Sequence, residues 1–596
     1  MCGIIGIVGT GPVASDLIAA LGRLEYRGYD SAGIALCQPD IAVHKVVGRP
    51  GDLLTVLNGH QATGRTGIGH TRWATHGRAE ARNAHPHVWE DVAVVHNGII
   101  ENHAALRAEL LALGHHFLSD TDSEVVPHLI AEARRAGATP EQAVRQACSR
   151  LHGSYAIAVM FADTQGCLLV ARHGSPVIVG VGAGAGAVAS DPVALSGICD
   201  RFMALEDGDL AIVSHESIHI TDPAGNTVDR PWEPVLDLDA ATTLDRFEHH
   251  TRREIAEQPA ALARTHAGLA GRTLPAAIAA ARRLIVVGCG SSLFAAAAAR
   301  GWLESLSGLP CDIEIASEFR YREAPIDRDS VAVLVSQSGE TADTLATLPL
   351  FRERGVPVVA VVNLAHSTMA RAADVIWPTD AGRENGVAAT KSFTAQLVAL
   401  LHLGMAFSAA RKGDPTRRAE VAAGLAAAPA ICAETEELEP ALAVLANRIA
   451  TEQEALFIGR RSGAAMAAEA ALKLKELSYI RADAYAAGEL KHGPIALIRA
   501  GSPVLVFAGS DALLSKTVSS AEEVRARGAH VVALTDSDGA AAFQGVARTV
   551  LTLPGHGVGH IFAQAVALQL LAYHAALALD RNVDRPRNLA KSVTVE

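Results

Sequence analysis

The residue with the clearest chemical potential stands second in the chain. The sequence opens MCGIIGIVGT, so Cys2 follows the initiator methionine and leads into a short apolar segment. If Met1 is removed, Cys2 carries an α-amino group with a pKa of about 8 beside its thiol, and one residue supplies both nucleophile and base. A buried small side chain and a lipid attachment point are the alternatives. We expect no lipid, because the basic and apolar leader that lipidation needs is missing.

Other polar residues of the first half suit the recognition of an amino acid. Asn97 and the backbone N–H of Gly98 can stabilise an oxyanion. Arg72 can bind a carboxylate through two parallel hydrogen bonds, and Asp122 can hold an ammonium group. A carboxylate and an ammonium form the head of an α-amino acid. We therefore expect the amide that Cys2 attacks to be that of glutamine.

A second cluster of polar residues follows a predicted buried strand, in VLVSQSGET. Ser336, Gln337, Ser338 and Thr341 stand between this strand and a predicted helix, and Ser292 follows the preceding strand. Hydroxyls and free N–H groups at a helix N-terminus suit a phosphate monoester. An ordinary helix cap also uses Ser or Thr, but four hydroxyls at two neighbouring strand ends favour a phosphate site. No GK[ST] follows, so we expect no nucleoside triphosphate.

A third cluster lies further along, in AAEAALKLKELSYI and AYAAGELKHGP. Glu469, Lys473 and Glu476 fall on one face of a predicted helix. From this stretch alone we favour a surface stripe of ion pairs. Glu489 and His492 stand in a glycine-bounded loop. A carboxylate and a histidine near a phosphate site are what an aldose–ketose isomerisation needs, a base for the C1–C2 proton and an acid to open the ring.

The elements that position these residues change in character along the 596-residue chain, which is too long for a single core. Residues 2–220 combine many hairpin-like strands with a few helices, which predicts an α+β sandwich. Residues 221–245 are polar and contain proline, so we predict a linker. From residue 246, Ala-rich helices alternate with short β-branched runs, which indicates parallel α/β architecture.

The α/β region repeats itself. Gly288 and Gly459, in matching strand-turn segments, lie 171 residues apart, and Gly355 and Gly528 lie 173 apart. This predicts two tandem, doubly wound domains, at 246–425 and 426–580, with ligands at the carboxyl ends of their strands.

Composition excludes several classes of partner and cofactor. The formal net charge of −12 argues against nucleic acid and anionic membranes. No apolar run reaches the roughly 18 residues of a membrane span. Eight scattered cysteines without a CxxC pair indicate a reduced, cytoplasmic protein. The 25 histidines show no metal-ligand spacing, so we expect neither a metal nor another cofactor.

Together these segments resemble the glutamine–fructose-6-phosphate aminotransferase (glucosamine-6-phosphate synthase) family from residue 2 to residue 596. The resemblance rests on MCGIIGIVG, LEYRGYDSAG, HTRWATHG, NAHPH, VVHNGIIENH, SDTDSE, SQSGETADTL, EAALKLKELSYI, AYAAGELKHGP and DRPRNLAKSVTVE. It implies an N-terminal-nucleophile glutaminase domain, two sugar-isomerase domains and a tail, 581–596, that completes the sugar site. Glutamine is then hydrolysed at Cys2, and its ammonia converts fructose 6-phosphate to glucosamine 6-phosphate.

The resemblance also implies the role of individual residues. The family's catalytic positions match Cys2, Asn97, Gly98, Glu476, His492 and Lys591. Its glutamine-binding positions match Arg72, Thr75, His76 and Asp122, and its channel gate matches Trp73. Its sugar-phosphate positions match Ser292, Ser336, Gln337, Ser338, Thr341, Val387 and Lys473. In the family the tail lysine forms a Schiff base with the ketose, and the histidine assists ring opening. A homodimer is implied in the same way.

Three departures bear on the sugar acceptor. Ala389 stands in GVAATKSFT where the family commonly has serine. The segment SSLFAAA at 291–297 lacks the family's usual tyrosine, and Ala465 stands where the second copy usually has one. One alternative is therefore an amidotransferase of the same architecture that acts on another ketose phosphate. The other is a non-catalytic sugar-phosphate sensor, which would have no use for Cys2 and would carry a basic helix-turn-helix that this chain lacks.

Overall fold

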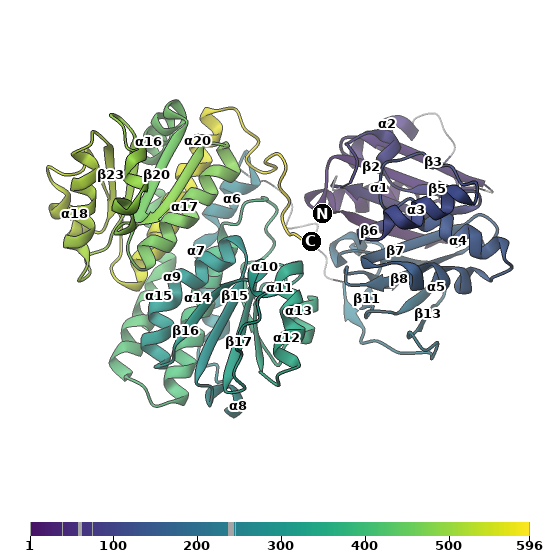
Figure 1. Cartoon of the computed structure of the whole chain (residues 1–596), viewed down its shortest axis with the longest axis horizontal. Helices are drawn as coiled ribbons and strands as arrows, with labels where there is room; N and C mark the ends of the chain where they lie inside the picture. The colour runs from purple at the N-terminus through teal and green to yellow at the C-terminus, as the bar shows by residue number, and fades with distance from the viewer. Residues whose placement is uncertain are drawn as a thin grey trace. The chain divides into compact units, whose positions relative to one another are not determined.

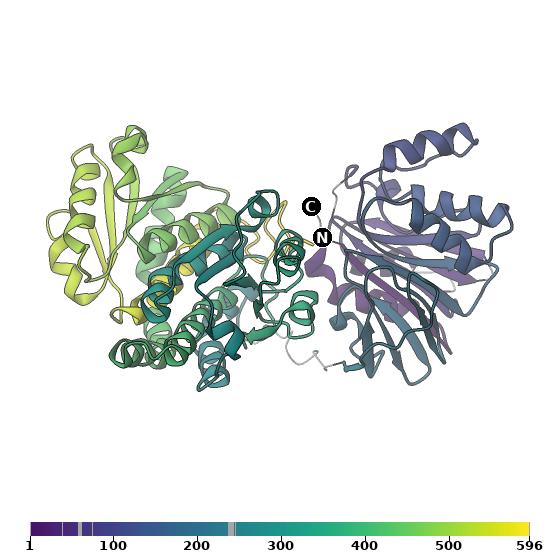
Figure 2. The same ribbon diagram turned by 60° about the horizontal axis from the view of Figure 1, so that its bottom comes forward.

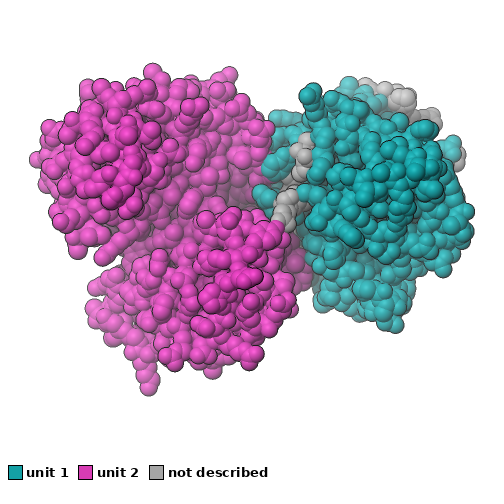
Figure 3. Space-filling view, viewed as in Figure 1, with its two compact units in different colours: residues 1–243, 592–596 teal, residues 244–591 magenta. Residues whose placement is uncertain are grey.

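The computed structural model describes residues 2–38, 40–57, 62–73, 76–235, 244 and 246–594. The chain divides into two compact units, drawn in two colours in Figure 3. One comprises Met1–Thr243 with Ser592–Glu596, and the other comprises Leu244–Lys591.

The N-terminal unit contains two antiparallel sheets (Figures 1 and 2). The first has the order β14-β11-β9-β10-β1-β4-β2-β3 and the second β13-β12-β8-β7-β6-β5. The first sheet consists of β1 Gly3–Gly9, β2 Ser31–Gln38, β3 Asp40–Val47, β4 Thr66–Arg72, β9 Ile178–Gly182, β10 Ala185–Ala189, β11 Arg201–Ala204 and β14 Glu233–Pro234. The second consists of β5 His87–Trp89, β6 Val92–Ile100, β7 Gly153–Phe161, β8 Cys167–His173, β12 Leu210–Ser214 and β13 Ile218–Thr221.

These sheets lie between helices and form four layers. Strand β1 shows why, because its side chains alternate between two buried faces. Ile4 and Val8 join the core between the sheets, whereas Ile5 and Ile7 pack with helix α1 (Ala14–Arg23). The outer face of the second sheet is covered by α3 His103–Ala112, α4 Val125–Arg135 and α5 Pro140–Arg150. The predicted α+β sandwich is confirmed.

Part of the segment predicted as a linker, 221–245, belongs to the N-terminal sandwich. Strand β14 pairs with β11 in the first sheet, so backbone hydrogen bonds hold residues 233–234 within the N-terminal unit. Residues 236–243 and 245 of the predicted linker lie outside the described residues.

The second unit contains two parallel five-stranded sheets of the same topology, β16-β15-β17-β18-β19 and β21-β20-β22-β23-β24. The first consists of β15 Arg283–Gly288, β16 Cys311–Ile315, β17 Ser330–Ser336, β18 Val358–Val362 and β19 Val375–Pro378. The second consists of β20 Glu454–Gly459, β21 Arg481–Ala486, β22 Pro503–Phe507, β23 His530–Thr535 and β24 Thr549–Thr552. The predicted tandem repeat of doubly wound domains is confirmed.

Helices cover both faces of each sheet, and one hydrophobic cluster joins the two domains. Longer helices of this unit are α7 Gln258–Leu269, α9 Gly290–Ser307, α14 Lys391–Ala410, α15 Pro415–Glu436, α16 Glu439–Glu452, α17 Ser462–Ser478, α18 Leu514–Arg525 and α20 Val558–Ala578. Shorter ones are α6 His250–Ala256, α8 Ala276–Ala279, α10 Ala316–Phe319, α11 Ala342–Ala346, α12 Leu348–Arg352, α13 Thr368–Ala372 and α19 Ser537–Ala540. The predicted boundary at 425/426 falls inside α15. This continuous helix packs against both α7 and α20.

Two helices bear on the expectation that no segment spans a membrane. By length and composition, α14 and α20 are apolar enough to cross a membrane, each with a mean hydropathy of 1.5. In both, 83% of that apolar window is buried inside the protein. They are therefore explained as core helices, whose continuous apolar sequence reflects burial on all sides.

Candidate functional site

Cys2 lies immediately before β1 and is half-buried. Its Sγ accepts a hydrogen bond from the backbone N–H of Trp73 at 3.4 Å. Its carbonyl oxygen accepts hydrogen bonds from Asn97 Nδ2 at 3.0 Å and from Arg27 Nε at 3.2 Å. Strand pairing of β1 with β4 thus places the thiol beside the end of β4.

The thiol of Cys2 is neutral at rest. Burial raises its pKa, and the positive charges of the amino terminus and Arg72 and the N–H of Trp73 offset this only partly. A neutral thiol is a poor nucleophile, so attack requires a base that removes its proton. This is consistent with the predicted use of an α-amino group.

Asn97 is fixed from both ends of its amide. Its Oδ1 lies 3.1 Å from His70 Nε2, which also lies 2.9 Å from the carbonyl oxygen of His96. Both partners are acceptors, so Nε2 carries the hydrogen. Burial lowers the pKa of His70 to about 3, which keeps the ring neutral. The neutral histidine therefore orients the Asn97 amide toward Cys2.

Gly98 occupies a backbone conformation that favours glycine. Its φ is +138°, and a Cβ added there would lie 1.9 Å from the carbonyl oxygen of Ser154 on β7. No other residue fits at this point of β6 without moving the neighbouring strand.

Arg72 and Asp122, the two residues predicted to bind the head of an amino acid, are both engaged in this structure. Arg72 donates to the carbonyl oxygens of His76, Gly77 and Arg78, the last at 3.1 Å. Asp122 Oδ2 accepts the N–H of Ile100 at 2.8 Å. Arg72 therefore has to break these hydrogen bonds before its two terminal nitrogens can bind a substrate carboxylate.

Two other positions of the glutamine group need comment. The ring of His76 lies 5.4 Å from that of His103, and its Nδ1 is buried without a partner among the described residues. Thr75 lies outside the described residues. Sequence analysis missed Arg27, although it stands in the quoted LEYRGYDSAG segment. It reaches Cys2 because its segment follows α1 and lies against the start of β1.

In the second unit, the predicted phosphate residues surround the carboxyl ends of β15 and β17. Ser336 Oγ lies 2.9 Å from Thr341 Oγ1 and accepts the N–H of Gly339 at 3.0 Å. Thr341 precedes α11, but its side chain makes no capping hydrogen bond. The cap interpretation is therefore wrong for Thr341. Helix α11 has only five residues, so its helix dipole is weak.

The neighbouring positions of this group also meet here. Ser292, near the start of α9, accepts a hydrogen bond from Gln396 Nε2 of α14 at 3.0 Å. Ser338 Oγ accepts the N–H of Glu340 at 3.1 Å, and Gln337 is half-buried in the same loop. The N–H of Val387 donates to the carbonyl oxygen of Asp584, which joins the 380s loop to the segment that follows α20.

The stripe of charges on α17 is buried, so the prediction of a surface stripe is wrong. Glu469 and Lys473 are 0% and 1% exposed. Lys473 Nζ lies 2.6 Å from Glu476 and 3.4 Å from Glu469, whose Oε1 accepts the Ser291 hydroxyl of α9 at 2.9 Å. Burial raises the pKa of Glu469 to about 7. Packing of α17 against α9 explains the difference, because only the tertiary structure covers this face.

Lys591 is held by a residue that sequence analysis missed. Its Nζ forms an ion pair with Glu384, and both side chains are almost fully buried. Glu384 also accepts hydrogen bonds from the N–H and hydroxyl groups of Thr390 and Ser392. Burial alone raises the pKa of Glu384, but the Lys591 charge and these hydrogen bonds lower it to about 2. Only its position shortly before GVAATKSFT hints at this role in the sequence.

A second buried carboxyl lies beside this pair. Glu254 of α6 accepts the N–H groups of Asn385 and Gly386. Burial and the negative charge of Glu384 raise the pKa of Glu254 to about 8, against the opposing charges of Lys591 and Lys391. The loop around Glu384 is thus fixed from α6, from the start of α14 and from the C-terminal segment.

His492 stands apart from these groups. It lies in the short helical turn Glu489–His492 and is exposed. Within the part of the chain that the structure describes, no hydrogen bond or ion pair joins it to Lys591, Glu476 or Lys473. No group of three or more His, Cys, Asp or Glu side chains in that part could hold a metal ion.

Comparison with known proteins covers both units. A family model described as a glutamine amidotransferase domain matches residues 70–197. A model described as a SIS domain matches twice, at residues 277–406 and 448–579. The two matches begin 171 residues apart, which agrees with the sequence repeat.

Curated relatives match the full chain. The glutamine–fructose-6-phosphate aminotransferases (isomerizing) of Brucella suis biovar 1 and Gluconobacter oxydans are each 44% identical, over 608 and 610 residues, and cover 100% of both chains. Among solved structures, the C-terminal domain of glucosamine-fructose-6-phosphate aminotransferase from Francisella tularensis is similar, with 34% identity and a TM-score of 0.55. That match covers 58% of this chain and 100% of the other.

Proposed function

The chain belongs to the glutamine–fructose-6-phosphate aminotransferase (isomerizing) family, and from this premise we propose that it transfers the amide nitrogen of glutamine to fructose 6-phosphate. The products are glutamate and glucosamine 6-phosphate. The N-terminal unit releases ammonia, and the isomerase unit uses it to aminate and isomerise the ketose.

In the first half-reaction, the Cys2 sulfur attacks the amide carbon of glutamine. The α-amino group takes the thiol proton and returns it to the leaving ammonia, and water then hydrolyses the thioester to glutamate. Asn97 Nδ2 and the Gly98 N–H hydrogen-bond to the oxyanion. The observation that most supports this proposal is the contact of Asn97 Nδ2 with Cys2, because it sets an oriented donor beside the nucleophile.

In the second half-reaction, Lys591 Nζ condenses with the ketose carbonyl and releases water. Ammonia then displaces the lysine, and Glu476 moves the proton between C1 and C2, while His492 assists ring opening. The loop Ser336–Thr341, with Ser292, binds the phosphate. The burial of Lys591 against Glu384 supports this role, because a solvated tail lysine would have no such fixed position.

The experiment that tests the proposal measures both products in the Cys2→Ala variant. We expect no glucosamine 6-phosphate and no glutamate from glutamine, while isomerisation of the sugar phosphate continues. Full glutamine-dependent synthesis in that variant would refute the role of Cys2. For Lys591, borohydride and mass spectrometry should trap a sugar adduct on the parent protein and none on Lys591→Ala, which retains basal glutaminase activity.

One residue favours a second candidate, an amidotransferase for another ketose phosphate. Ala389 is half-buried in the loop beside Glu384 and presents a methyl group where the family commonly has a hydroxyl. A panel of ketose phosphates supplied with glutamine distinguishes the two. Higher kcat/KM for any ketose phosphate other than fructose 6-phosphate would favour the second candidate.

The proposal includes a cytoplasmic homodimer. The exposure of His492, away from the other isomerase residues, supports it, because such a residue is available to a second copy. Light scattering should give twice the chain mass of 62.1 kDa. A single-chain mass in an active preparation would contradict the dimer.

A further inference from the structure

The two isomerase sheets have the same topology, so each has one corresponding point at which the chain reverses its direction across the sheet. The chain runs from β15 to β16 on one side and returns to β17 on the other, and β20, β21 and β22 repeat this path. Ligands of open parallel sheets bind at the carboxyl ends of the two strands between which the chain reverses. In the first sheet this place holds Ser292 and the loop Ser336–Thr341. The proposed reaction uses no residue at the second place.

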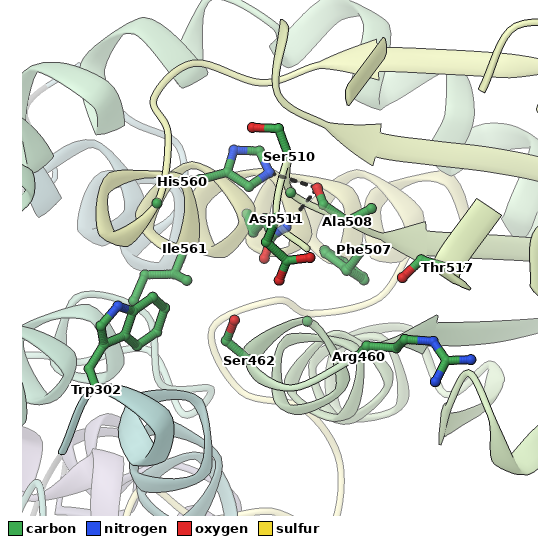
Figure 4. Close-up of a pocket in the computed structure, with 14 residues that line it drawn as sticks. Trp302, Arg460, Ser462, Phe507, Ala508, Ser510, Asp511, Thr517, His560 and Ile561 are labelled. Atoms are coloured by element: carbon green, nitrogen blue, oxygen red, sulfur yellow. Dashed lines mark hydrogen bonds between the residues drawn. The ribbon is translucent and has the colours of Figure 1, made fainter. Parts of the chain in front are cut away.

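A cavity of about 110 Å³ occupies the second place (Figure 4). It is lined by Ser462, which follows β20, and by Asp511, which follows β22. Gln564 of α20 and Trp302 of α9 line it from the side of the core. Since one water needs roughly 10–15 Å³ of such space, the cavity has room for a small organic molecule.

The register of the two sheets shows how this cavity differs from the phosphate loop. Gly288 pairs with Val335, and Gly459 pairs with Phe507. Counting onward from these pairs, the hydroxyls of Ser292 and Ser336 are replaced by Gly463 and Ala508. Gly339 is replaced by Asp511. A carboxylate at this position repels a phosphate dianion, which the glycine of the first loop does not.

Two acceptors in the cavity lack a donor. Gln564 is only 3% exposed, and its Nε2 lies 3.5 Å from the carbonyl oxygen of Ala508. Among the described residues, nothing donates to its Oε1. Asp511 Oδ1 accepts the N–H of Leu513 at 2.8 Å, but its Oδ2 has no such donor and the residue forms no ion pair there. Gln564 Oε1 and Asp511 Oδ2 are thus left as acceptors at the cavity, and a ligand with several donors fits them.

The remaining lining is partly apolar, at Trp302, Phe507 and Ile561, and partly polar, at Ser510, Thr517 and His560. The indole of Trp302 lies beside Ile561 at the opening toward α9 (Figure 4). Arg460 also lines the cavity, but its guanidinium donates to Ser520 Oγ at 3.3 Å and lies away from Asp511 in the same view. An aromatic wall opposite a few acceptors suits a molecule with one apolar C–H face and a rim of hydroxyl groups.

We propose that the carboxyl ends of β20 and β22 bind a small unphosphorylated sugar, which donates hydroxyl hydrogens to Gln564 and Asp511 and stacks on Trp302. This site is separate from the reacting sugar. Its occupation does not depend on whether the proposed aminotransferase reaction is right. An ammonium group on the sugar adds an attraction to the Asp511 carboxylate.

The test is saturation-transfer NMR on the full chain with D-glucose and D-glucosamine as probes. Fructose 6-phosphate is present at saturation, so that the first site is filled. We expect transfer to both probes, with the Kd of glucosamine at least threefold lower than that of glucose. Glucose 6-phosphate should give at least fivefold less transfer than glucose.

Variants assign the signal to the cavity. Gln564→Met and Trp302→Leu should each reduce transfer at least fivefold, and Asp511→Asn should remove the preference for glucosamine. Ser336→Ala is the matched control in the first domain and should leave transfer to glucose unchanged. Asp511 is exposed, so Asp511→Asn tests the site even if the buried variants do not fold.

Three results would overturn the proposal. The first is no transfer to either probe at 50 mM, and the second is complete displacement of both by fructose 6-phosphate. The third is an unchanged glucosamine preference in Asp511→Asn. Synthesis of glucosamine 6-phosphate by the same preparation is measured separately, so failure of this site is distinguishable from failure of the proposed reaction.

Discussion

Lys591 and Glu384 form an ion pair that is almost fully buried in the isomerase unit. The two side chains are 4% and 0% exposed. Removing one partner of such a pair leaves the other charge buried, at a cost of about 3–5 kcal/mol. The presence of this buried pair is therefore better explained by a chemical role than by a contribution to stability.

At this residue scale we expect Glu384→Gln to lower the unfolding free energy of the isomerase unit by about 3–5 kcal/mol and to abolish amino-sugar synthesis. The double variant Glu384→Gln, Lys591→Met should regain much of the stability, because no unpaired charge remains, but none of the activity. Urea unfolding and a glucosamine 6-phosphate assay measure the two effects. Additive losses of stability in the double variant would contradict the pairing.

Glu254 gives a prediction for pH dependence. Its pKa is raised to about 8 in the folded protein, above the ordinary value of 4.5, so the folded state binds the extra proton between these values. The stability that this extra proton gives to the folded state is present at low pH and is lost as pH rises from about 4.5 to 8. In Glu254→Gln that loss should disappear. If the thermal midpoints of parent and variant change in parallel from pH 4.5 to 8, the pKa of Glu254 is not raised.

At the scale of elements, α14 shows why the two isomerase domains fold as one unit. Nearly the whole helix is buried, and it contacts α9 and α7 while its apolar side chains join a cluster shared by both domains. Helix α17 reaches the same cluster from the second domain and carries Lys473 and Glu476. The hydrophobic core thus fixes the position of the helix that carries Lys473 and Glu476.

We expect Leu400→Ala in α14 to lower the unfolding free energy of this unit by about 2–5 kcal/mol, because Leu400 is 0% exposed and leaves a cavity. Val444→Ala on α16 is the matched control, since Val444 is 72% exposed and its loss should cost less than about 0.5 kcal/mol. Differential scanning calorimetry measures both. Equal shifts would contradict the assignment of α14 to the core.

At the scale of the whole molecule, two chemistries share one chain. The thiol of Cys2 has a raised pKa and needs activation, so uncontrolled glutamine hydrolysis is slow unless the site is rearranged. Arg72 also donates hydrogen bonds to loop carbonyls, and glutamine has to displace them before it can bind. In this structure the guanidinium of Arg72 is therefore held by the loop carbonyls.

We expect fructose 6-phosphate to increase the rate of glutamate release, because coupling prevents loss of ammonia without an acceptor. Glutamate is measured enzymatically with and without the sugar, at saturating glutamine. Glucose serves as the control and should have no comparable effect on the rate. A rate that fructose 6-phosphate leaves unchanged would show that the two half-reactions are uncoupled.

The sequence determined the architecture because the relevant signals are local. Alternating faces in GIIGIVG and β-branched runs between Ala-rich helices depend on neighbouring residues, and the 171-residue repeat needs no structure at all. Cys2, Asn97 and the hydroxyls of SQSGET were predicted as site residues for the same reason, since each lies within a short motif. Lys591 was found only through family resemblance.

Tertiary structure alone decided which charges are buried. The stripe of Glu469, Lys473 and Glu476 looks like a solvated helix face until α9 covers it, and no spacing in the sequence reveals that contact. Glu384 and Lys591 lie 207 residues apart and meet only because the segment after α20 returns to the loop before α14. Burial and long-range pairing are properties of the packed chain, and these set the pKa values on which the chemistry depends.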